Sequence, residues 1–256
     1  MSERPGARAA ARAEAAPLTP ATPDGAFGVS AARRGLDIVV AGLLIVLAAP
    51  VVLAAALAIV LTDGRPVWFR QERVGEGGVA FRLTKLRTMR VCTAGTVAGA
   101  GVTAAGDARI TRVGALLRRL SIDELPQLCD VLRGRMTLVG PRPESLPLAE
   151  RYPAECRVVL MARPGLTGPA QLTYRERSAV PPENWGDVEA WYLSRLVPLR
   201  VEADLGYLQR PTLPATVRWL CLTALFVVGL VDLQAPARAG TGAGSGTVEA
   251  QPATEP

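Results

Sequence analysis

The most prominent feature of the hydrophobic pattern is an apolar stretch that runs from Leu36 to Leu61 almost without interruption. It covers about 26 residues, and roughly 20 apolar residues in a helix are enough to cross the hydrocarbon core of a bilayer. The stretch starts too late and runs too long for a secretory signal peptide, and it lacks a convincing cleavage site. The pattern therefore predicts a membrane-associated helix over residues 31–62.

Whether this helix crosses the membrane or re-enters it stays open on the residues alone. Pro50 lies in its middle, where the missing N–H and the ring kink a helix. Both flanks are basic, so the positive-inside rule assigns the helix no orientation. The flanking basic residues are Arg33, Arg34, Arg65, Arg70 and Arg73. A helix that bends at Pro50 and returns would keep both flanks in the cytoplasm, whereas a straight span is the alternative because many spanning helices contain proline.

The remaining pattern predicts an α+β domain that is mostly helical. Short strand-like segments alternate with segments of helix-like apolar spacing. The former are Val67–Phe69, Val79–Leu83 and Thr137–Val139, and the latter are Ile110–Leu120 and Leu125–Leu132. Gly75, Gly77 and Gly78 lie between the first two strand-like segments and predict a hairpin turn. A second apolar stretch, Trp219–Val231, is too short to span and predicts an interfacial or core helix.

Composition divides the chain into a body and two polar ends. Residues 1–30 are rich in Ala, Pro and Arg and are expected to form a disordered leader. Residues 233–256 are expected to form a disordered tail. Gly and Ala dominate Val91–Gly106, which is typical of a flexible loop. Residues 63–232 are then the expected catalytic domain.

Charge and residue usage narrow the chemistry. The 256 residues are 49% hydrophobic and carry a net charge of +6, which favours an anionic membrane surface, a phosphorylated substrate or nucleic acid as partner. The absence of histidine excludes histidine bases, triads and metal ligands. Four widely spaced cysteines indicate neither a zinc site nor a disulfide framework. Lys85 is the single lysine among many arginines, which makes it a candidate for a specific role.

The adjacent carboxylates Asp123 and Glu124 are the first candidates for catalysis. One interpretation is a capping box, with Ser121 as N-cap and Glu124 at the third helical position. Pro126 instead favours a helix that starts at Pro126 with Leu125 as its cap. Both alternatives put the carboxylates at the positive end of a helix, which favours their ionised form. An ionised aspartate is a usable nucleophile toward phosphorus.

Arginines provide candidates for phosphate binding. Arg142 lies between two prolines after an apolar segment, so a stiff loop would present its guanidinium as a phosphate clamp, with a rigid surface turn as the alternative. Basic residues also cluster before and after the Gly/Ala-rich loop, where they form either solvated faces or a site for lipid headgroups or a diphosphate. These clusters are Arg82, Lys85, Arg87 and Arg90, then Arg109, Arg112, Arg118 and Arg119.

The order of short motifs resembles the bacterial sugar transferase family, the monotopic phosphoglycosyl transferases, over about residues 32–230. Each motif is weak singly, but their shared order is specific. They are Gln71-Glu-Arg-Val-Gly75, Lys85-Leu-Arg-Thr-Met89, Asp107-Ala-Arg-Ile-Thr-Arg-Val-Gly114, Asp123-Glu-Leu-Pro-Gln-Leu128, Val139-Gly-Pro-Arg-Pro143 and Arg163-Pro-Gly-Leu-Thr-Gly-Pro-Ala-Gln171.

The resemblance implies an activity and a set of roles. Family members transfer a sugar phosphate from a UDP-sugar to undecaprenyl phosphate and release UMP, which starts a polysaccharide or glycoconjugate. Asp123 matches the nucleophile that carries the covalent phospho-sugar, Glu124 matches a Mg²⁺ ligand, and Arg142 matches a substrate-phosphate ligand. The family's N-terminal helix is re-entrant and breaks at a proline, here Pro50. This places the catalytic domain on the cytoplasmic face of the bacterial inner membrane.

Further site residues are expected on the same basis. Asp123 is expected to contribute to the metal site beside Glu124. Substrate phosphate is also assigned to basic residues of the other motifs and of the segment after the last one. These are Lys85, Arg87, Arg112 and Arg175.

Two positions depart from the family's pattern, and two rival functions remain to be tested. Arg135 stands where an acidic residue is common, and Thr216 stands where a second aspartate is expected about twelve residues after Asp204. One rival is a membrane-tethered basic module without activity, but 5% aromatic residues give little surface for stacking nucleic-acid bases, so nucleic acid is not expected as a partner. The other rival is a lipid phosphatase, which the motif order disfavours.

Overall fold

The computed structural model describes residues 27–90, 107–174 and 188–231. Residues 1–26 of the expected leader 1–30, the loop Val91–Gly106 and the tail 233–256 lie outside the described residues. The described part is an α+β fold that is mostly helical, as the pattern predicted. In chain order its elements are α2 (Ala31–Asp63), β1 (Trp68–Val74), η1 (Glu76–Gly78), β2 (Ala80–Leu86), α3 (Arg112–Arg119), η2 (Ile122–Gln127), α4 (Leu128–Leu132), β3 (Thr137–Val139), α5 (Leu146–Glu150), η3 (Ala154–Met161), β4 (Gly165–Thr167), α6 (Pro169–Thr173), α7 (Val188–Trp191), η4 (Tyr192–Leu196), α8 (Val197–Leu208) and α9 (Leu213–Val227), where η1, η2 and η3 are 3₁₀ helices and η4 is a π-helix.

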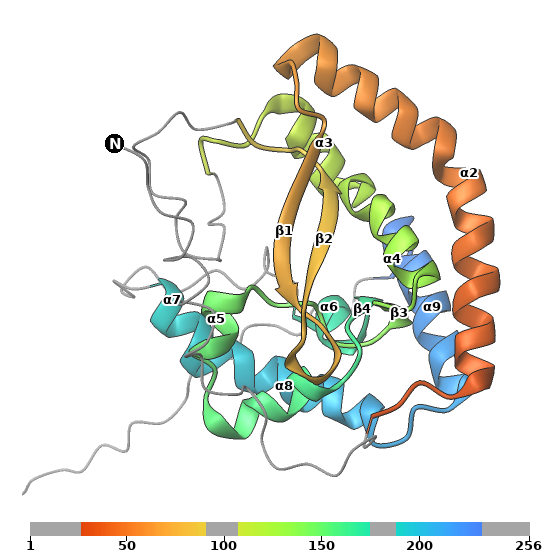
Figure 1. Ribbon diagram of the computed structural model, residues 1–256, viewed down its shortest axis with the longest axis vertical. Helices are drawn as coiled ribbons and strands as arrows, with labels where there is room; N and C mark the ends of the chain where they lie inside the picture. The colour runs from red at the N-terminus through yellow and green to blue at the C-terminus, as the bar shows by residue number, and fades with distance from the viewer. Residues whose placement is uncertain (1–26, 91–106, 175–187, 232–256) are drawn as a thin grey trace, which may run out of the picture.

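The long apolar stretch forms the single helix α2, which begins after Ser30 and contains Pro50. The Ser30 hydroxyl caps the helix by accepting from the Arg33 N–H at 3.4 Å. The helix bends midway, so that its first half runs along one side of the molecule and its second half turns across the end (Figure 1). Its outward-facing apolar side chains are exposed, among them Val39, Val46 and Leu53. Such a large exposed apolar surface is typical of contact with a membrane or another partner.

Polar contacts fix the beginning of α2 on the body. The Arg34 guanidinium donates to the carbonyls of Val131 and Leu132 at the end of α4, at 2.6 and 2.7 Å. Asp37 is fully buried, and its carboxylate accepts from the Thr137 hydroxyl at 2.8 Å and the Leu138 N–H at 2.9 Å, both on β3. An aspartate in an apolar stretch is therefore retained because it satisfies the end of a buried strand.

The end of α2 is fixed on the same body. Ala55 and Ile59 are buried against Leu86 of β2 and Leu117 of α3. Arg87 follows β2, and its guanidinium donates to carbonyls at the end of the helix, where carbonyl groups have no partner inside the helix. Both ends of α2 thus rest on one domain, and its middle carries the exposed apolar surface.

Two small sheets carry the rest of the fold. Strands β1 and β2 pair antiparallel with Phe69 opposite Lys85, which confirms the predicted hairpin and makes both strands longer than the predicted segments. Strands β3 and β4 pair parallel, and β3 matches the predicted Thr137–Val139. The apolar stretch at Trp219–Val231 belongs to helix α9, which begins earlier than predicted, at Leu213. Figure 1 shows α3 at the upper end of the hairpin, with α8 crossing below it.

Candidate active site

The Asp123–Glu124 pair lies in the first turn of the 3₁₀ helix η2, which begins after Ser121, as one of the two predicted starts had it, whereas the predicted start at Pro126 was wrong. Ser121 precedes the helix, but its side chain makes no capping hydrogen bond because its backbone is left-handed, with φ of 56°. Pro126 lies inside η2 instead of starting a helix. Regular α-helical hydrogen bonding begins only at Leu128, so the chain avoids the clash that Pro126 would cause in an α-helix.

Two cations hold the Glu124 carboxylate. Its Oε1 accepts from Lys85 Nζ at 2.8 Å and from Arg142 Nη1 at 3.3 Å. Burial alone would raise the pKa of Glu124, but the charges of Lys85 and Arg142 outweigh burial and keep that pKa well below its usual range. Glu124 is therefore ionised and charge-compensated at neutral pH. The second strand of the hairpin and the Gly-Pro-Arg-Pro loop meet at this carboxylate.

The neighbouring Asp123 has the opposite environment. It is 7% exposed, and its carboxylate makes no hydrogen bond or ion pair with any residue that the structure describes. Burial and the charge of Glu124 raise its pKa, and this outweighs the opposing effects of Lys85, Arg118 and Arg142. Glu124 thus follows the expectation that the ionised form is favoured at the helix start, whereas burial opposes it at Asp123.

The other expected phosphate ligands are distributed unevenly. Arg87 donates to the end of α2, as described above, and Arg112 is exposed at the start of α3. Arg175 lies outside the described residues. Arg118, which was grouped with Arg112 only as part of a basic segment, is the α3 residue whose charge acts on Asp123. Its Nε donates to the Thr88 hydroxyl at 3.0 Å, which orients the guanidinium.

The loop that presents Arg142 is packed directly against the second Gly/Pro-rich motif. Gly140 N donates to the Thr167 carbonyl at 2.9 Å, and Gly165 N donates to the Pro141 carbonyl at 2.7 Å. A Cβ at Gly165 would lie 2.1 Å from Gly140 N, so side chains are excluded at this contact. The glycines of these two motifs therefore serve close backbone packing that fixes the Arg142 loop.

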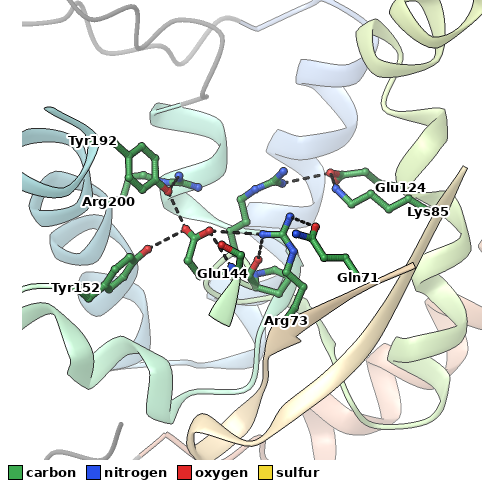
Figure 2. A network of polar contacts seen from close by, with 11 residues as sticks. Gln71, Arg73, Lys85, Glu124, Glu144, Tyr152, Tyr192 and Arg200 are labelled. Atoms are coloured by element: carbon green, nitrogen blue, oxygen red, sulfur yellow. Dashed lines mark hydrogen bonds and ion pairs between the residues drawn. The ribbon is translucent and has the colours of Figure 1, made fainter. Parts of the chain in front are cut away.

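A buried carboxylate that the sequence reasoning did not select lies behind this loop (Figure 2). Glu144 Oε2 accepts from the hydroxyls of Tyr152 at 3.0 Å and Tyr192 at 2.8 Å. Its Oε1 accepts from Ser145 N at 3.0 Å and lies 3.5 Å from Arg73 Nη1. The available signal was its position directly after the Gly-Pro-Arg-Pro motif, but its partners come from distant segments.

A small cavity of ≈ 30 Å³ opens beside Arg142 and Glu144. Arg200 and Asp204 of α8 also line it. Asp204 is buried, and its Oδ1 accepts from Ala170 N at 3.1 Å. Burial raises the pKa of Asp204 to about 7, despite the opposing effects of this hydrogen bond and the charge of Arg200.

The two positions that depart from the family's pattern have structural partners. Thr216 is buried, donates to the Thr212 carbonyl at 3.0 Å and shares a hydrogen bond with the Tyr207 hydroxyl at 2.8 Å. Arg135 pairs with Asp130 of α4. Both side chains therefore make contacts within the fold.

The donor set limits the metal that the site could hold. Among the described residues no three Asp, Glu or Cys side chains come together. Asp123 and Glu124 are thus the candidate ligands, and Glu124 Oε2 makes no hydrogen bond with a described residue that would compete. One or two carboxylates completed by substrate phosphates and water suit Mg²⁺. Carboxylates, guanidinium groups and a lysine around one point are typical of enzymes that transfer phosphoryl groups.

Comparison with known proteins identifies the family to which the chain belongs. Residues 29–229 match the bacterial sugar transferase family, so the chain belongs to it, and the resemblance drawn from the motifs is confirmed.

Three relatives match over part or most of this range. A UDP-glucose:undecaprenyl-phosphate glucose-1-phosphate transferase of Caulobacter vibrioides is 45% identical over 196 residues, 75% of this chain and 68% of the relative. A UDP-N-acetylgalactosamine-undecaprenyl-phosphate N-acetylgalactosaminephosphotransferase of Aeromonas hydrophila is 42% identical over 145 residues, 56% of this chain but 34% of the relative. An exopolysaccharide production protein of Rhizobium leguminosarum is 40% identical over 148 residues, 55% of this chain and 72% of the relative.

Proposed function

We propose that this chain transfers a sugar 1-phosphate from a UDP-sugar to undecaprenyl phosphate, with release of UMP, and thereby initiates exopolysaccharide or glycoconjugate synthesis. The observation that carries the proposal is the asymmetry of the Asp123–Glu124 pair. Glu124 is held by Lys85 and Arg142, whereas the Asp123 carboxylate makes no hydrogen bond or ion pair with a described residue. A carboxylate without hydrogen bonds beside a cluster of cations is suited to attack an anionic diphosphate.

The reaction proceeds in two displacements at one phosphorus atom. An Asp123 carboxylate oxygen attacks the phosphorus that bears the sugar, the bond from that phosphorus to the bridging oxygen breaks, and UMP leaves with that oxygen. A phosphate oxygen of undecaprenyl phosphate then attacks the aspartyl phospho-sugar and releases the carboxylate. The products are UMP and undecaprenyl diphosphate-sugar. Neither nucleophile needs a histidine base, because carboxylate and phosphate are anionic when they attack.

Cations reduce the repulsion between the carboxylate and the diphosphate. Arg142 binds the transferred phosphate through its planar guanidinium, and Lys85 compensates the charge of Glu124. Mg²⁺ would be held by Glu124 and Asp123 and would supply further charge neutralisation for the leaving UMP. Arg118 adds a third positive charge near Asp123.

We further propose that α2 is a re-entrant membrane helix that leaves the catalytic domain on the cytoplasmic face. The helix has 33 residues. A straight helix of this length would extend roughly 50 Å, at about 1.5 Å per residue, and would place its ends on opposite sides of a bilayer. The two ends of α2 instead bind one body, through Arg34 and Asp37 at the start and Arg87 at the end. The bend midway and Pro50 inside the helix are consistent with this arrangement (Figure 1).

The test is a trapping experiment with a matched control. Wild-type protein is mixed with a UDP-sugar labelled in the sugar, without acceptor, and the labelled adduct is mapped by mass spectrometry. Asp123→Asn, which is nearly isosteric, is expected to lose the adduct and at least about 10³-fold in turnover. Asp130→Asn is the control, because Asp130 in α4 is also a buried carboxylate but pairs with Arg135. Its activity is expected within about threefold of wild type.

The products separate this proposal from its rivals. Mg²⁺-dependent release of UMP from a UDP-sugar in the presence of undecaprenyl phosphate supports a transferase. Release of inorganic phosphate from the lipid would support a phosphatase, and salt-sensitive nucleic-acid binding without turnover would support a basic tether. Near wild-type turnover of Asp123→Asn would remove Asp123 from the mechanism.

A further inference from the structure

The network behind the Arg142 loop joins parts of the chain that are far apart in sequence. Figure 2 shows Glu144 at its centre, with Tyr152 and Tyr192 on one side and Arg73 on the other. Tyr192 belongs to the π-helix η4, and its hydroxyl also accepts from Arg200 Nη1 at 2.7 Å. Such π-helical turns are rare and occur frequently at functional sites. The Glu144 carboxylate is therefore held by donors from separate elements.

The end of β1 holds the backbone of the same loop. Arg73 Nη1 donates to the Pro143 carbonyl at 3.3 Å, and Arg73 Nη2 donates to the Gln71 side-chain oxygen at 2.8 Å. The Val74 N–H donates to the Glu144 carbonyl at 2.8 Å. The Gln71-Glu-Arg-Val-Gly75 motif, which has no role in the proposed chemistry, thus fixes the residues that follow Arg142.

The prolines on both sides of Arg142 stiffen the loop, so that contacts at Pro143 and Glu144 also fix the position of the Arg142 guanidinium. Pro141 and Pro143 each restrict a backbone torsion, so a displacement of Glu144 is transmitted to Arg142 and not absorbed between them. The Arg142 Nη1 atom lies 3.3 Å from Glu124 Oε1. A small displacement of the planar Arg142 guanidinium would change which oxygen atoms it can bind. Glu144 itself is 6% exposed and bonded away from Asp123, so it has no direct role in the reaction proposed above.

We infer that Glu144 is a positioning residue for Arg142: the Arg73–Glu144–Tyr152–Tyr192 network sets the guanidinium for the donor phosphate. The inference rests on the proposed function for the identity of that phosphate. It differs from a general stabilising role in one measurable respect. If Glu144 acts through Arg142, its replacement matters only while Arg142 is present.

A double-mutant cycle tests this dependence. Glu144→Gln keeps the shape of the side chain but loses one acceptor oxygen and the charge opposite Arg73, and we expect kcat to fall about tenfold with a smaller change in the donor KM. Arg142→Lys is expected to lose about 10²-fold. The double variant is expected within about twofold of Arg142→Lys, whereas independent effects would multiply to about 10³-fold. Asp130→Asn in the same cycle is the control, and its small effect should multiply with that of Arg142→Lys.

The remaining outcomes are equally decisive. Multiplying effects of Glu144→Gln and Arg142→Lys, or a Glu144→Gln enzyme with wild-type kcat, would overturn the inference. Should Glu144→Gln fail to fold, Tyr152→Phe replaces it in the cycle, because it removes one donor and leaves Glu144 its contacts with Tyr192 and Ser145. The same rule applies: multiplying effects, or a wild-type kcat for Tyr152→Phe, overturn the inference.

Binding separates failure of the inference from failure of the proposed function. The cycle is repeated on the affinity for UDP, measured by calorimetry in detergent without turnover. If the wild type binds UDP but transfers no sugar, the proposed function fails while the affinity cycle still decides the role of Glu144. A wild type that neither turns over nor binds UDP overturns both.

Discussion

Asp204 provides the sharpest prediction for stability. Its carboxyl is buried on α8 with one hydrogen bond, from Ala170 N at 3.1 Å. Burial raises its pKa from 3.8 to about 7, because the Ala170 N–H and the charge of Arg200 compensate only part of the desolvation. The folded protein therefore binds the Asp204 proton more tightly than the unfolded chain does.

This difference fixes both the sign and the size of a pH effect. Stability falls with rising pH wherever the folded state holds more protons, so the loss begins near pH 3.8 and is complete above about pH 7. Roughly three pH units at about 1.4 kcal/mol each give an upper limit of about 4 kcal/mol. Asp204→Asn resembles the protonated acid, so it should match wild type near pH 4 and be more stable at pH 8.

The measurement is the melting temperature of both proteins in one detergent between pH 4 and pH 8. For a domain of this size the full effect corresponds to a difference on the order of 10 °C at pH 8. Other carboxylates titrate in both proteins and cancel in the difference. Glu202→Gln is the control, because Glu202 is exposed on the same helix. A difference between Asp204→Asn and wild type that does not change with pH, or a less stable variant at pH 8, would refute the reasoning.

Three further predictions test the site, the packing and the topology. Arg142→Lys should lose about 10²-fold in kcat/KM for the UDP-sugar, because a point charge cannot replace the fork; unchanged steady-state kinetics would contradict this. Gly165→Ala should lower the melting temperature, because its Cβ would lie 2.1 Å from Gly140 N. By contrast, Gly206→Ala, where a Cβ would meet no atom, should raise it by the equivalent of about 0.5–1 kcal/mol. Single cysteines placed just before and just after α2 should both react with an impermeant thiol reagent only from the cytoplasmic side, and labelling from opposite sides would refute the re-entrant helix.

The hydrophobic pattern was sufficient for the elements with a strong local signal. It predicted α2, the hairpin and β3, because apolar length and turn glycines are local signals. It left the start of η2 open between Ser121 and Leu125 as the cap, because a 3₁₀ turn does not have the 3.6-residue period and Pro126 suggested an α-helical start elsewhere. Asp37 was a visible signal, a carboxylate within an apolar run, whose strand partners only the structure reveals.

The residues of the candidate site also divide into those that the sequence could predict and those that it could not. Motif order selected Asp123, Glu124, Lys85 and Arg142, and the structure brings these residues together. It could not separate an arginine that faces the carboxylates from one such as Arg87 that binds helix carbonyls, because charge spacing along the chain is the same for both. The Glu144 network could not be predicted from the sequence for another reason. Its members come from elements as distant in the chain as β1 and α8, and their contacts depend on tertiary packing.

The contrast between Asp123 and Glu124 explains how adjacent carboxylates could have different tasks. Three cationic side chains, Lys85, Arg118 and Arg142, act on the two carboxylates, so the centre has one net positive charge when both acids are ionised. That charge attracts an anionic diphosphate. Hydrogen bonds would stabilise the ground state of a nucleophile, and they go to Glu124 and not to Asp123. Pushing the pKa values of neighbouring carboxylates apart is how a site assigns them separate roles. Here Lys85 on β2 bonds Glu124, which under the proposed function leaves Asp123 as the carboxylate that reacts.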